Sequence, residues 1–294
     1  MTSTASFGPG VLRPPMTLGD VRVRFYCGGR LSLDGGAMFG IIPKPLWSRS
    51  VRCDERNRIP LTTTCLLVET AGRRVLIETG VGGKYDAKDR EIFALSDAWL
   101  LDSLAADGVS VDSIDTVILT HLHFDHAGGV SCLDANGSIV PTFPAARFVV
   151  QRGEWDDAVA GHFVMTGTYR RENLEPLEQS GRMELIDGEA EIAPGVSVLP
   201  LPGHTRHQQG VLIRGGGRTL LQPADLLPTA AHVGLRWNMA YDLLPYENMR
   251  TKSRMLEAAQ AGDWTIVTAQ DPDWQAWRVQ RTDRGFALAR DERT

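Results

Sequence analysis

A cluster of residue types that bind metals lies near the middle of the chain, in the segment Thr120-His-Leu-His-Phe-Asp-His-Ala-Gly-Gly129. His121, His123, Asp125 and His126 place three imidazoles and one carboxylate within six residues. Imidazole nitrogen and carboxylate oxygen are the ligands that zinc and similar divalent ions prefer. The two histidines at 121 and 123 point to the same side of an extended segment. The pattern predicts a metal site rather than an ordinary polar loop.

The residues before this cluster predict how it is positioned. Asp115–Leu119 is a short apolar run rich in β-branched residues, which is typical of a buried strand. The segment 99–107 has the apolar pattern of an amphipathic helix that stops at Gly108 and leads into this strand. We therefore expect the cluster in a tight loop at the end of a strand, where neighbouring side chains can converge.

The cluster resembles the His-x-His-x-Asp-His motif of the metallo-β-lactamase superfamily, and two downstream segments extend the resemblance. Leu201-Pro-Gly-His-Thr205 resembles the Gly-His-Thr loop of the family, and Gln222-Pro-Ala-Asp-Leu226 resembles its segment with a metal-bridging aspartate. Their order and spacing fit from about residue 61 to residue 274. The resemblance implies an α/β fold, an αββα four-layer sandwich with a two-metal centre at one edge. It implies one ion at His121, His123 and His204, another at Asp125 and His126, and Asp225 as the bridge.

Gln270 departs from the family pattern. Where the family usually has its last histidine ligand, this chain reads Ala269-Gln270-Asp271-Pro272. An amide oxygen is neutral like imidazole, but it is a poorer ligand for zinc and suits magnesium or manganese better. Three outcomes stay open: a weakened second site that includes Gln270, a single-metal site, or a relative that binds metal or ligand without efficient turnover. We expect two divalent ions, zinc first, with manganese or iron as alternatives.

Several other residues near the motifs need an interpretation. Glu78-Thr79-Gly80 stands where the family usually has Asp-Thr-Gly, so any hydrogen bond from Glu78 to the site must be re-aimed. His207 could partly substitute for the missing histidine, although a single nearby histidine more often only makes hydrogen bonds to ligands. Arg206 could meet a substrate carboxylate or lie in solvent. We interpret His162 and His232 as structural by default, but a role of His232 at the site stays open because it follows Asp225 closely in the sequence.

The predicted chemistry is metal-assisted hydrolysis. Two divalent ions can share one water and lower its pKa, so that hydroxide is available near pH 7 to attack a carbonyl carbon or a phosphorus. Asp125 is then both a ligand and the group that steers the attack. Tyr241 could donate a hydrogen bond to the oxyanion, as a tyrosine does in lactonase-like relatives, or could be a core residue.

The substrate class follows from resemblance alone. The run Gly36-Ala-Met-Phe-Gly40, followed by Pro43-Lys44, resembles a lactonase-like branch of the superfamily. It implies that a lactone or similar ester is opened, with an N-acyl-homoserine lactone as the first guess. Five aromatic residues near the expected pocket also favour a small, partly apolar substrate: Phe39, Trp47, Phe124, Trp237 and Tyr241. The alternative is a degenerate relative that binds without efficient turnover because of Gln270.

Composition excludes some classes of function. The 294 residues are 43% hydrophobic and 23% charged, as in an ordinary globular protein, and the net charge of −5 disfavours a nucleic-acid partner. The four cysteines lie far apart without a C-x-x-C pair, which favours a reducing compartment. No apolar run is long enough for a membrane span, and no signal peptide is visible, so we expect a cytoplasmic protein. A homodimer is expected from resemblance only.

The chain is expected to form a single domain over residues 20–294 behind a flexible N-terminal arm over residues 1–19, which are rich in Pro, Gly, Ser and Thr. The first expected strand is Val21–Phe25, and the last is Thr265–Thr268, which delivers Gln270. The apolar segment 33–47 is expected to form a loop that is a pocket wall, a dimer contact or a lid over the core.

Overall fold

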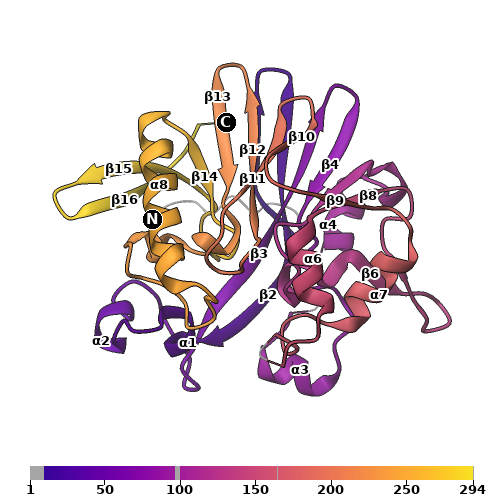
Figure 1. The fold of residues 1–294 in the computed structure, drawn as a ribbon, viewed down its shortest axis with the longest axis horizontal. Coiled ribbons are helices and arrows are strands. Elements are labelled where there is room, and N and C mark those ends of the chain that lie inside the picture. The colour runs from indigo at the N-terminus through magenta and orange to yellow at the C-terminus, as the bar shows by residue number, and fades with distance from the viewer. Residues whose placement is uncertain (1–9, 97–99, 164, 294) are drawn as a thin grey trace.

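The two large sheets of the molecule lie against each other in its middle. The structure is a computed structural model that describes residues 10–96, 100–163 and 165–293. In Figure 1 the strands occupy the centre, with α8 on one side and α4, α6 and α7 on the other. The layers are therefore helix, sheet, sheet and helix, which is the predicted αββα sandwich.

The first sheet has the strand order β1-β2-β3-β4-β5-β8-β9. Its strands β5 and β8 run parallel to β4 and to each other, whereas β1 to β4 are antiparallel neighbours. The strands of this sheet are β1 (Val11–Leu18), β2 (Val21–Asp34), β3 (Arg58–Thr70), β4 (Arg73–Ile77), β5 (Thr116–Ile118), β8 (Arg147–Gln151) and β9 (Met183–Ile186).

The second sheet is made of the later strands in the order β10-β11-β12-β13-β14-β15-β16. Only β13 and β14 pair in parallel. Its strands are β10 (Ala190–Ala193), β11 (Val196–Pro200), β12 (Gln209–Gly215), β13 (Arg218–Gln222), β14 (Thr265–Val267), β15 (Ala276–Thr282) and β16 (Gly285–Arg290). A small separate sheet pairs β6 (Ser131–Leu133) with β7 (Ile139–Pro141).

Alternation along the strands explains the four layers. In β4, Val75 and Ile77 join the core between the sheets, whereas Leu76 faces the helices of the first outer layer. In β13, Leu220 faces the first sheet and Leu221 packs against α8. Successive side chains of a strand point to opposite faces, so strands that are apolar at every position require cover on both sides.

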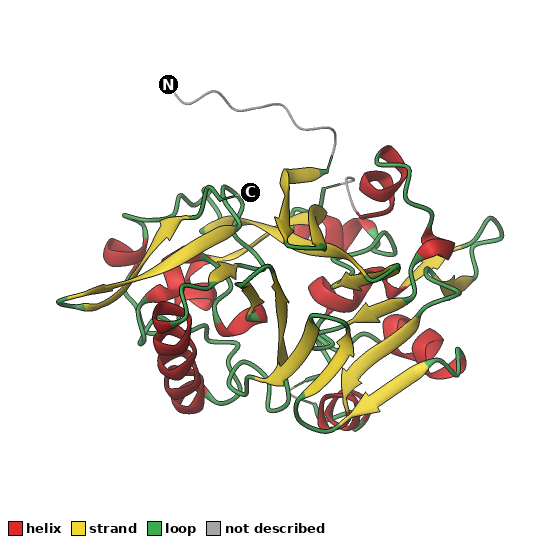
Figure 2. Cartoon of the chain, turned by 90° about the horizontal axis from the view of Figure 1, so that it is seen from above, coloured by secondary structure: helices red, strands yellow, loops and turns green. Residues whose placement is uncertain are grey.

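The helices supply that cover. Leu100 and Leu104 of α4, Trp155 of α6 and Leu177 of α7 pack on the outer face of the first sheet. Figure 2 shows the same arrangement from above, with the strands between two sets of helices. The α-helices are α1 (Gly35–Phe39), α2 (Lys44–Trp47), α3 (Ala87–Ile92), α4 (Leu100–Ala106), α5 (Phe124–Ala127), α6 (Arg152–Val159), α7 (Arg171–Gln179) and α8 (Pro245–Ala261). The 3₁₀ helices are η1 (Val111–Ser113), η2 (Gly128–Val130), η3 (Ala224–Leu226) and η4 (Ala230–Val233).

The prediction of a flexible arm over residues 1–19 is wrong for residues 11–18, while residues 1–9 lie outside the described part. Strand β1 pairs with β2, and its Met16 and Leu18 are buried between the sheets. Pro14 and Pro15 lie where the register with β2 shifts, at the edge of the sheet. Proline is tolerated at edges and bulges of a sheet, so a Pro-rich composition did not exclude a strand here.

Two further expectations about elements are corrected. Strand β14 is not the last, because β15 and β16 form an antiparallel hairpin beyond it. The segment 33–47 is not a loop: it ends β2 and then forms the short helices α1 and α2, which bury Met38, Phe39 and Trp47. None of the helices in the described part of the chain combines the length and apolar character required for a membrane span.

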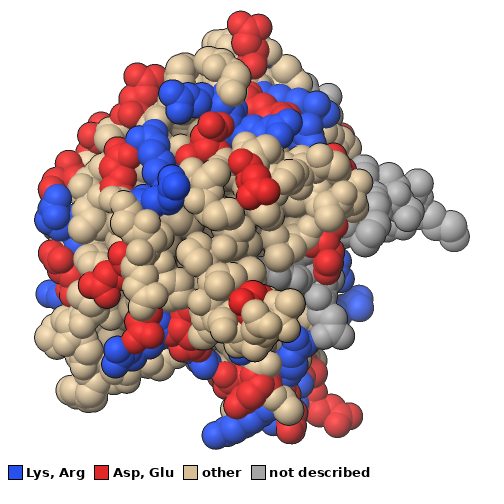
Figure 3. Space-filling model, turned by 90° about the vertical axis from the view of Figure 1, so that its right-hand side faces the viewer, with Lys and Arg blue, Asp and Glu red and all other residues tan. Residues whose placement is uncertain are grey.

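The surface charges are mixed in sign on the face shown in Figure 3. Lys and Arg side chains lie among Asp and Glu side chains there, with a broad uncharged area between them. Charges of both signs interspersed in this way do not create the single-sign field that attracts a polyanion.

Candidate metal centre

The two sheets are joined by hydrogen bonds at one edge of the sandwich, and this joint brings distant segments together. The amide N–H of Gln209 donates to the carbonyl of Thr120 (2.9 Å), just before His121. The N–H of Thr64 donates to the carbonyl of Ala269 (2.7 Å), just before Gln270. The loops that follow β5, β11, β13 and β14 therefore meet at this edge, and each carries at least one predicted ligand.

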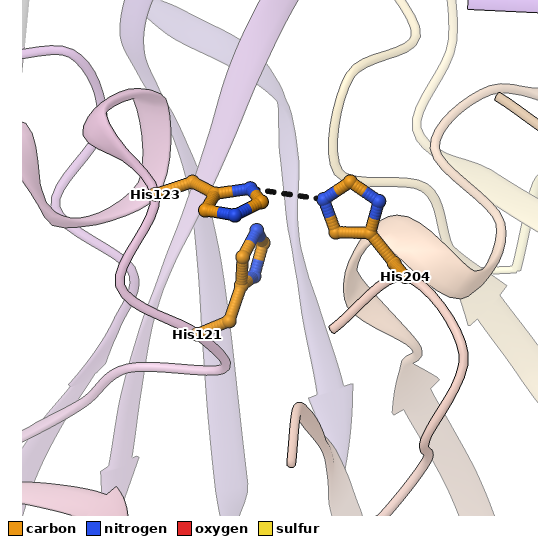
Figure 4. Close-up of side chains that lie close together, drawn as sticks. All are labelled: His121, His123 and His204. Carbon is orange, nitrogen blue, oxygen red and sulfur yellow. Dashed lines mark hydrogen bonds between the residues drawn. The ribbon is translucent and has the colours of Figure 1, made fainter. Parts of the chain in front are cut away.

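The His121, His123 and His204 side chains, which we call the tri-histidine half, converge from two loops. One ligand atom of each residue lies within 4.8 Å of those of the other two, and all three residues are buried. His204 Nε2 lies 3.0 Å from His123 Nδ1. In Figure 4 the three rings point toward one another, with His204 approaching from the side opposite to His121 and His123. Three imidazoles on one point form a ligand set typical of zinc.

Asp125, His126, Asp225 and Gln270 lie beside this group, and we call them the carboxylate half. His126 Nε2 lies 3.3 Å from Asp225 Oδ1 and 3.5 Å from Asp125 Oδ2. The ligand atoms of His126 and Asp225 also lie within 4.8 Å of one on His121. Asp225 Oδ2 is 3.6 Å from His204 Nε2, so its carboxylate lies between the two halves. All seven predicted ligands are thus brought together and buried.

Gln270 lies against both carboxylates. Its Nε2 donates to Asp125 Oδ2 (2.7 Å) and to Asp225 Oδ2 (3.2 Å), while its Oε1 is buried without a hydrogen-bond partner among the described residues. The His121 Nε2 atom is buried without a partner as well. Asp225 Oδ1 is a third such atom among the described residues. Buried polar atoms are normally paired, so three atoms without a hydrogen-bond partner in one cluster fit a bound cation. The residues present therefore fit divalent metal ions.

The backbone around the predicted ligands is tightly packed and partly strained. A Cβ on Gly128 would lie 1.8 Å from the carbonyl oxygen of Val81, so the Gly-Gly pair after His126 is needed for this close backbone approach. Two non-glycine residues adopt positive φ next to the site: Glu78 (65°) and Ala224 (52°), which directly precedes Asp225. Strained backbone of this kind concentrates at functional sites, where surrounding structure holds it.

Carboxylates outside the ligand set orient the histidines. Asp242 Oδ1 lies 3.0 Å from His204 Nδ1, and Glu78 Oε2 lies 3.2 Å from His126 Nδ1. Each carboxylate accepts the Nδ1 proton, which leaves Nε2 as the ligand atom. The hydroxyl of Thr120 contacts His121 Nδ1 (3.0 Å) in the same way.

Glu154 of α6 fixes the two loops of the tri-histidine half. Its Oε1 accepts from the N–H of Leu122 (3.0 Å), between His121 and His123, and its Oε2 accepts from the hydroxyl of Thr205 (2.6 Å), next to His204. Burial raises the pKa of Glu154, although the hydrogen bonds that it accepts oppose this. The sequence contains no signal for Glu154 or Asp242, because both lie outside the motifs and act only once the fold brings them near.

Burial and neighbouring charges set the ionisation of the site. Burial, reinforced by the other imidazoles, holds the pKa of His121 and of His123 well below the usual value, so both are neutral at pH 7. Burial also lowers the pKa of His126, but Asp225, Asp125 and Glu78 outweigh it and raise that pKa well above the usual value. Burial raises the pKa of Asp125. The two halves therefore differ in how strongly protons compete with a metal.

The remaining histidines lie away from the centre. His232 is fully buried, with Nε2 donating to the carbonyl of Met38 (2.8 Å) and Nδ1 facing Thr229 Oγ1 (2.7 Å). Both ring nitrogens are used, and burial lowers its pKa to about 4, so it is a structural histidine. His207 is exposed and packs against Gly153, which gives no support to its role as a substitute ligand. His162 is exposed, and Arg206 pairs with Asp157.

Tyr241, the remaining predicted site residue, directly precedes Asp242 in the chain. Its side chain is partly exposed, and it makes no hydrogen bond with another described residue. Burial, together with the charges of Asp34 and Asp125, raises its pKa to about 12, so the hydroxyl keeps its proton at neutral pH. The segment that carries Tyr241 approaches the centre, because the next residue, Asp242, contacts His204 Nδ1 (3.0 Å).

Comparison with known proteins agrees with this geometry. The family model described as "Metallo-beta-lactamase superfamily" matches residues 58–270. The solved structure of a probable metal-dependent hydrolase from Staphylococcus aureus is 30% identical, with a TM-score of 0.86 over 94% of this chain and 99% of that chain. The structure of AidC, a dizinc quorum-quenching lactonase in complex with a product, is 18% identical, with a TM-score of 0.80 over 97% of this chain and 98% of that chain.

The chain belongs to the metallo-β-lactamase superfamily, since the family model spans most of its length. Among curated relatives, the N-acyl homoserine lactonase AiiB of Agrobacterium fabrum is 27% identical over 251 residues, which are 78% of this chain and 86% of that protein. Within the superfamily the chain falls in the lactonase-like branch. It is a metallo-hydrolase of this superfamily, as the comparisons and the metal-ligand geometry agree.

Proposed function

We propose that this protein is a metal-dependent hydrolase that opens a lactone or a similar small ester, with an N-acyl-homoserine lactone as the first substrate to test. The observation that carries the proposal is the convergence of the tri-histidine half and the carboxylate half at one edge of the sandwich. The relatives that are named as lactonases supply the substrate class.

The proposed cofactor is a pair of divalent ions, zinc first, with manganese or iron as alternatives. His121, His123 and His204 would hold one ion, and Asp125, His126 and Gln270 the other, with Asp225 shared. Such ions lower the pKa of a bound water and polarise the carbonyl of a substrate. Because the Gln270 amide donates hydrogen bonds to both Asp125 and Asp225, the second metal site is expected to be the weaker one.

The residues of the chain supply orientation and proton transfer. Asp125, next to both Gln270 and His126, orients the attacking water and receives its proton. Tyr241 donates a hydrogen bond to the oxygen that gains negative charge, because its hydroxyl is protonated and free.

The segment that resembles lactonases lies beside Tyr241. The N–H of Ala240 donates to the carbonyl of Ala37 (2.8 Å), and Met38 and Phe39 share an apolar cluster with Phe124 and Met239. These residues form an apolar wall next to the centre, which suits a small substrate with an apolar part. This arrangement supports the role of segment 33–47 as a pocket wall.

The test is a substrate panel on protein loaded with zinc or with manganese. Lactones, thioesters, β-lactams and phosphotriesters should be compared, and lactones should be hydrolysed fastest. Tyr241→Phe should lower kcat on the lactone by about tenfold, the scale of one lost hydrogen bond, and leave metal content unchanged. A loss of metal in this variant would contradict the role of Tyr241.

A competing proposal is a protein that binds metal or ligand without efficient turnover, and Gln270 is the observation that favours it. Its amide already satisfies Asp125 and Asp225, which could keep the carboxylate half from completing a reactive centre. Absence of turnover on the whole panel with either metal, in protein that binds lactone, would support this alternative.

A further inference from the structure

Helix α8 buries two polar side chains that the proposed chemistry does not use. Asn248 and Lys252 are one turn apart on the same face and are 1% and 0% exposed. Elsewhere this helix packs in the ordinary way, with Met255 and Leu256 against the second sheet. Burying an ammonium group is costly unless it is well bonded, so its position calls for an explanation.

The Lys252 ammonium donates three hydrogen bonds to one short segment. Its Nζ donates to the carbonyls of His232 (3.2 Å) and Trp237 (2.9 Å) and to Asn238 Oδ1 (3.1 Å). This uses all three of its donors. Residues 232–238 are thereby held against α8, and this segment leads directly to Asp242.

Asn248 connects the same segment to Asp242. Its Nδ2 donates to Asn238 Oδ1 (3.1 Å) and to Asp242 Oδ2 (3.0 Å). The other oxygen of Asp242 lies 3.0 Å from His204 Nδ1. A continuous series of hydrogen bonds therefore runs from Lys252 through Asn238, Asn248 and Asp242 to a predicted metal ligand.

Asn248 also packs against the loop that carries His204. A Cβ on Gly203 would lie 2.6 Å from the Asn248 Cα, so only glycine fits before His204. The backbone of the same loop is bonded to the segment after Asp242, because the N–H of Leu243 donates to the carbonyl of His204 (2.9 Å). Helix α8 thus contacts both the ligand loop and the carboxylate that orients its imidazole.

We propose that Asn248 and Lys252 are positioning residues that fix His204, through Asn238 and Asp242, in the orientation required to bind metal. The inference rests on the proposed metal centre and adds a function for α8, which otherwise only covers the sheet. Lys252 and Asn248 both donate to Asn238 Oδ1, and Asn248 also donates to Asp242 Oδ2. Loss of Lys252 should therefore loosen the series of hydrogen bonds that holds Asp242.

The experiment measures zinc affinity by competition with a chromogenic chelator, without substrate, on the full chain. Lys252→Met and Asn248→Ala are each expected to weaken the tightly bound zinc by about tenfold, the lower end of the effect of residues that orient ligands. The double variant should lose little more than either single variant, because both residues act in one series of contacts. Cobalt substitution adds a spectroscopic readout, in which the visible absorption bands should change in the same variants.

Leu256→Ala is the matched control on the same helix. It creates a cavity in the apolar core between α8 and the second sheet, and it should lower the Tm without changing zinc affinity. If Lys252→Met does not fold, Asn238→Ala tests the same series at its junction, with the same expected loss of affinity. Wild-type zinc affinity in Lys252→Met or Asn238→Ala, at a Tm lowered as in Leu256→Ala, would overturn the proposal.

The result that would refute the proposed lactonase activity differs from the one that would refute the role of α8. A wild-type protein that binds zinc tightly but hydrolyses none of the panel refutes the lactonase activity and leaves the effect of α8 on zinc affinity measurable. A wild-type protein that binds no zinc refutes both.

Discussion

The two halves of the candidate metal centre are built differently. In the tri-histidine half, the imidazoles are oriented from behind by groups that do not compete for the ion: Asp242 on His204, Thr120 on His121, and Glu154 on both loops. In the carboxylate half, Gln270 lies inside the ligand set and donates to both acids. Both halves have a carboxylate behind one histidine, Asp242 on His204 and Glu78 on His126, but only in the carboxylate half does an amide hydrogen-bond to the two acids.

This difference in construction predicts that the two halves bind metal ions with unequal affinities. An ion entering the tri-histidine half meets two imidazoles, His121 and His123, whose pKa values burial holds low. The third, His204, has a pKa that burial lowers but that Asp242 and Asp225 raise above the usual value. An ion entering the carboxylate half must displace both the amide hydrogen bonds of Gln270 and the proton of His126, whose pKa is raised well above the usual value. Metal ligands must be deprotonated, so each displaced proton or hydrogen bond reduces the net binding free energy. The centre should fill in order, with the tri-histidine half first.

The largest effect should come from Asp225→Ala, which removes the only carboxylate between the two halves among the described residues. Hydrolysis should fall to the background rate because both ions lose a shared ligand. Metal analysis of the same variant should show at most one ion per chain. Retained activity would mean that the two halves do not act together.

A pair of variants should separate the halves. Asp242→Asn should weaken the ion of the tri-histidine half by about 10- to 100-fold, and Glu78→Gln should do the same to the ion of the carboxylate half. Each removes the charge behind one histidine while keeping the shape of the side chain. Stepwise chelation followed by metal counting distinguishes them, and an equal effect of both variants on both ions would contradict the comparison.

Gln270→His should reduce the difference in metal affinity between the two halves. An added imidazole removes the amide donor and supplies a better zinc ligand, so affinity at the carboxylate half should rise by about tenfold or more. Metal content should approach two ions per chain, and the rate on the lactone should increase. Two tightly held ions in the wild-type protein would show that Gln270 does not weaken the site.

The smallest expected effect is a difference between the pH values at which the two halves release their ions. Carboxylates raise the pKa of His126 well above the usual value, whereas in the tri-histidine half burial lowers the pKa of His121 and His123 and only that of His204 is raised, so protons compete more strongly at the carboxylate half. As the pH falls, this half should lose its ion at a higher pH than the tri-histidine half. Metal content after dialysis at a series of pH values measures the order, and simultaneous release would contradict it.

The sequence predicted the convergence of the ligand set because family motifs report order and spacing directly. His121, His123, His204 and Asp225 lie in segments that match such motifs, and the structure brings them together. Their role as metal ligands remains a prediction. The sandwich was predictable for the same reason, and also because strands such as β4 are apolar at successive positions.

The supporting residues were not predictable, because their contacts are made between segments far apart in the chain. Glu154 and Asp242 are both buried, but neither has a local sequence pattern that distinguishes it from a surface acid. Strand β1 was missed because its prolines favour a loop locally, while its pairing with β2 decides the outcome. The hairpin of β15 and β16 was missed because half-exposed strands lack a strong apolar run.

The proline pair in β1 also affects how molecules of this protein can meet. Pro14 and Pro15 lie on the outermost strand of the first sheet, and proline has no amide hydrogen to donate. A strand from a neighbouring molecule could not form an unbroken ladder along that border. The proline pair therefore works against the edge-to-edge joining of two molecules along β1.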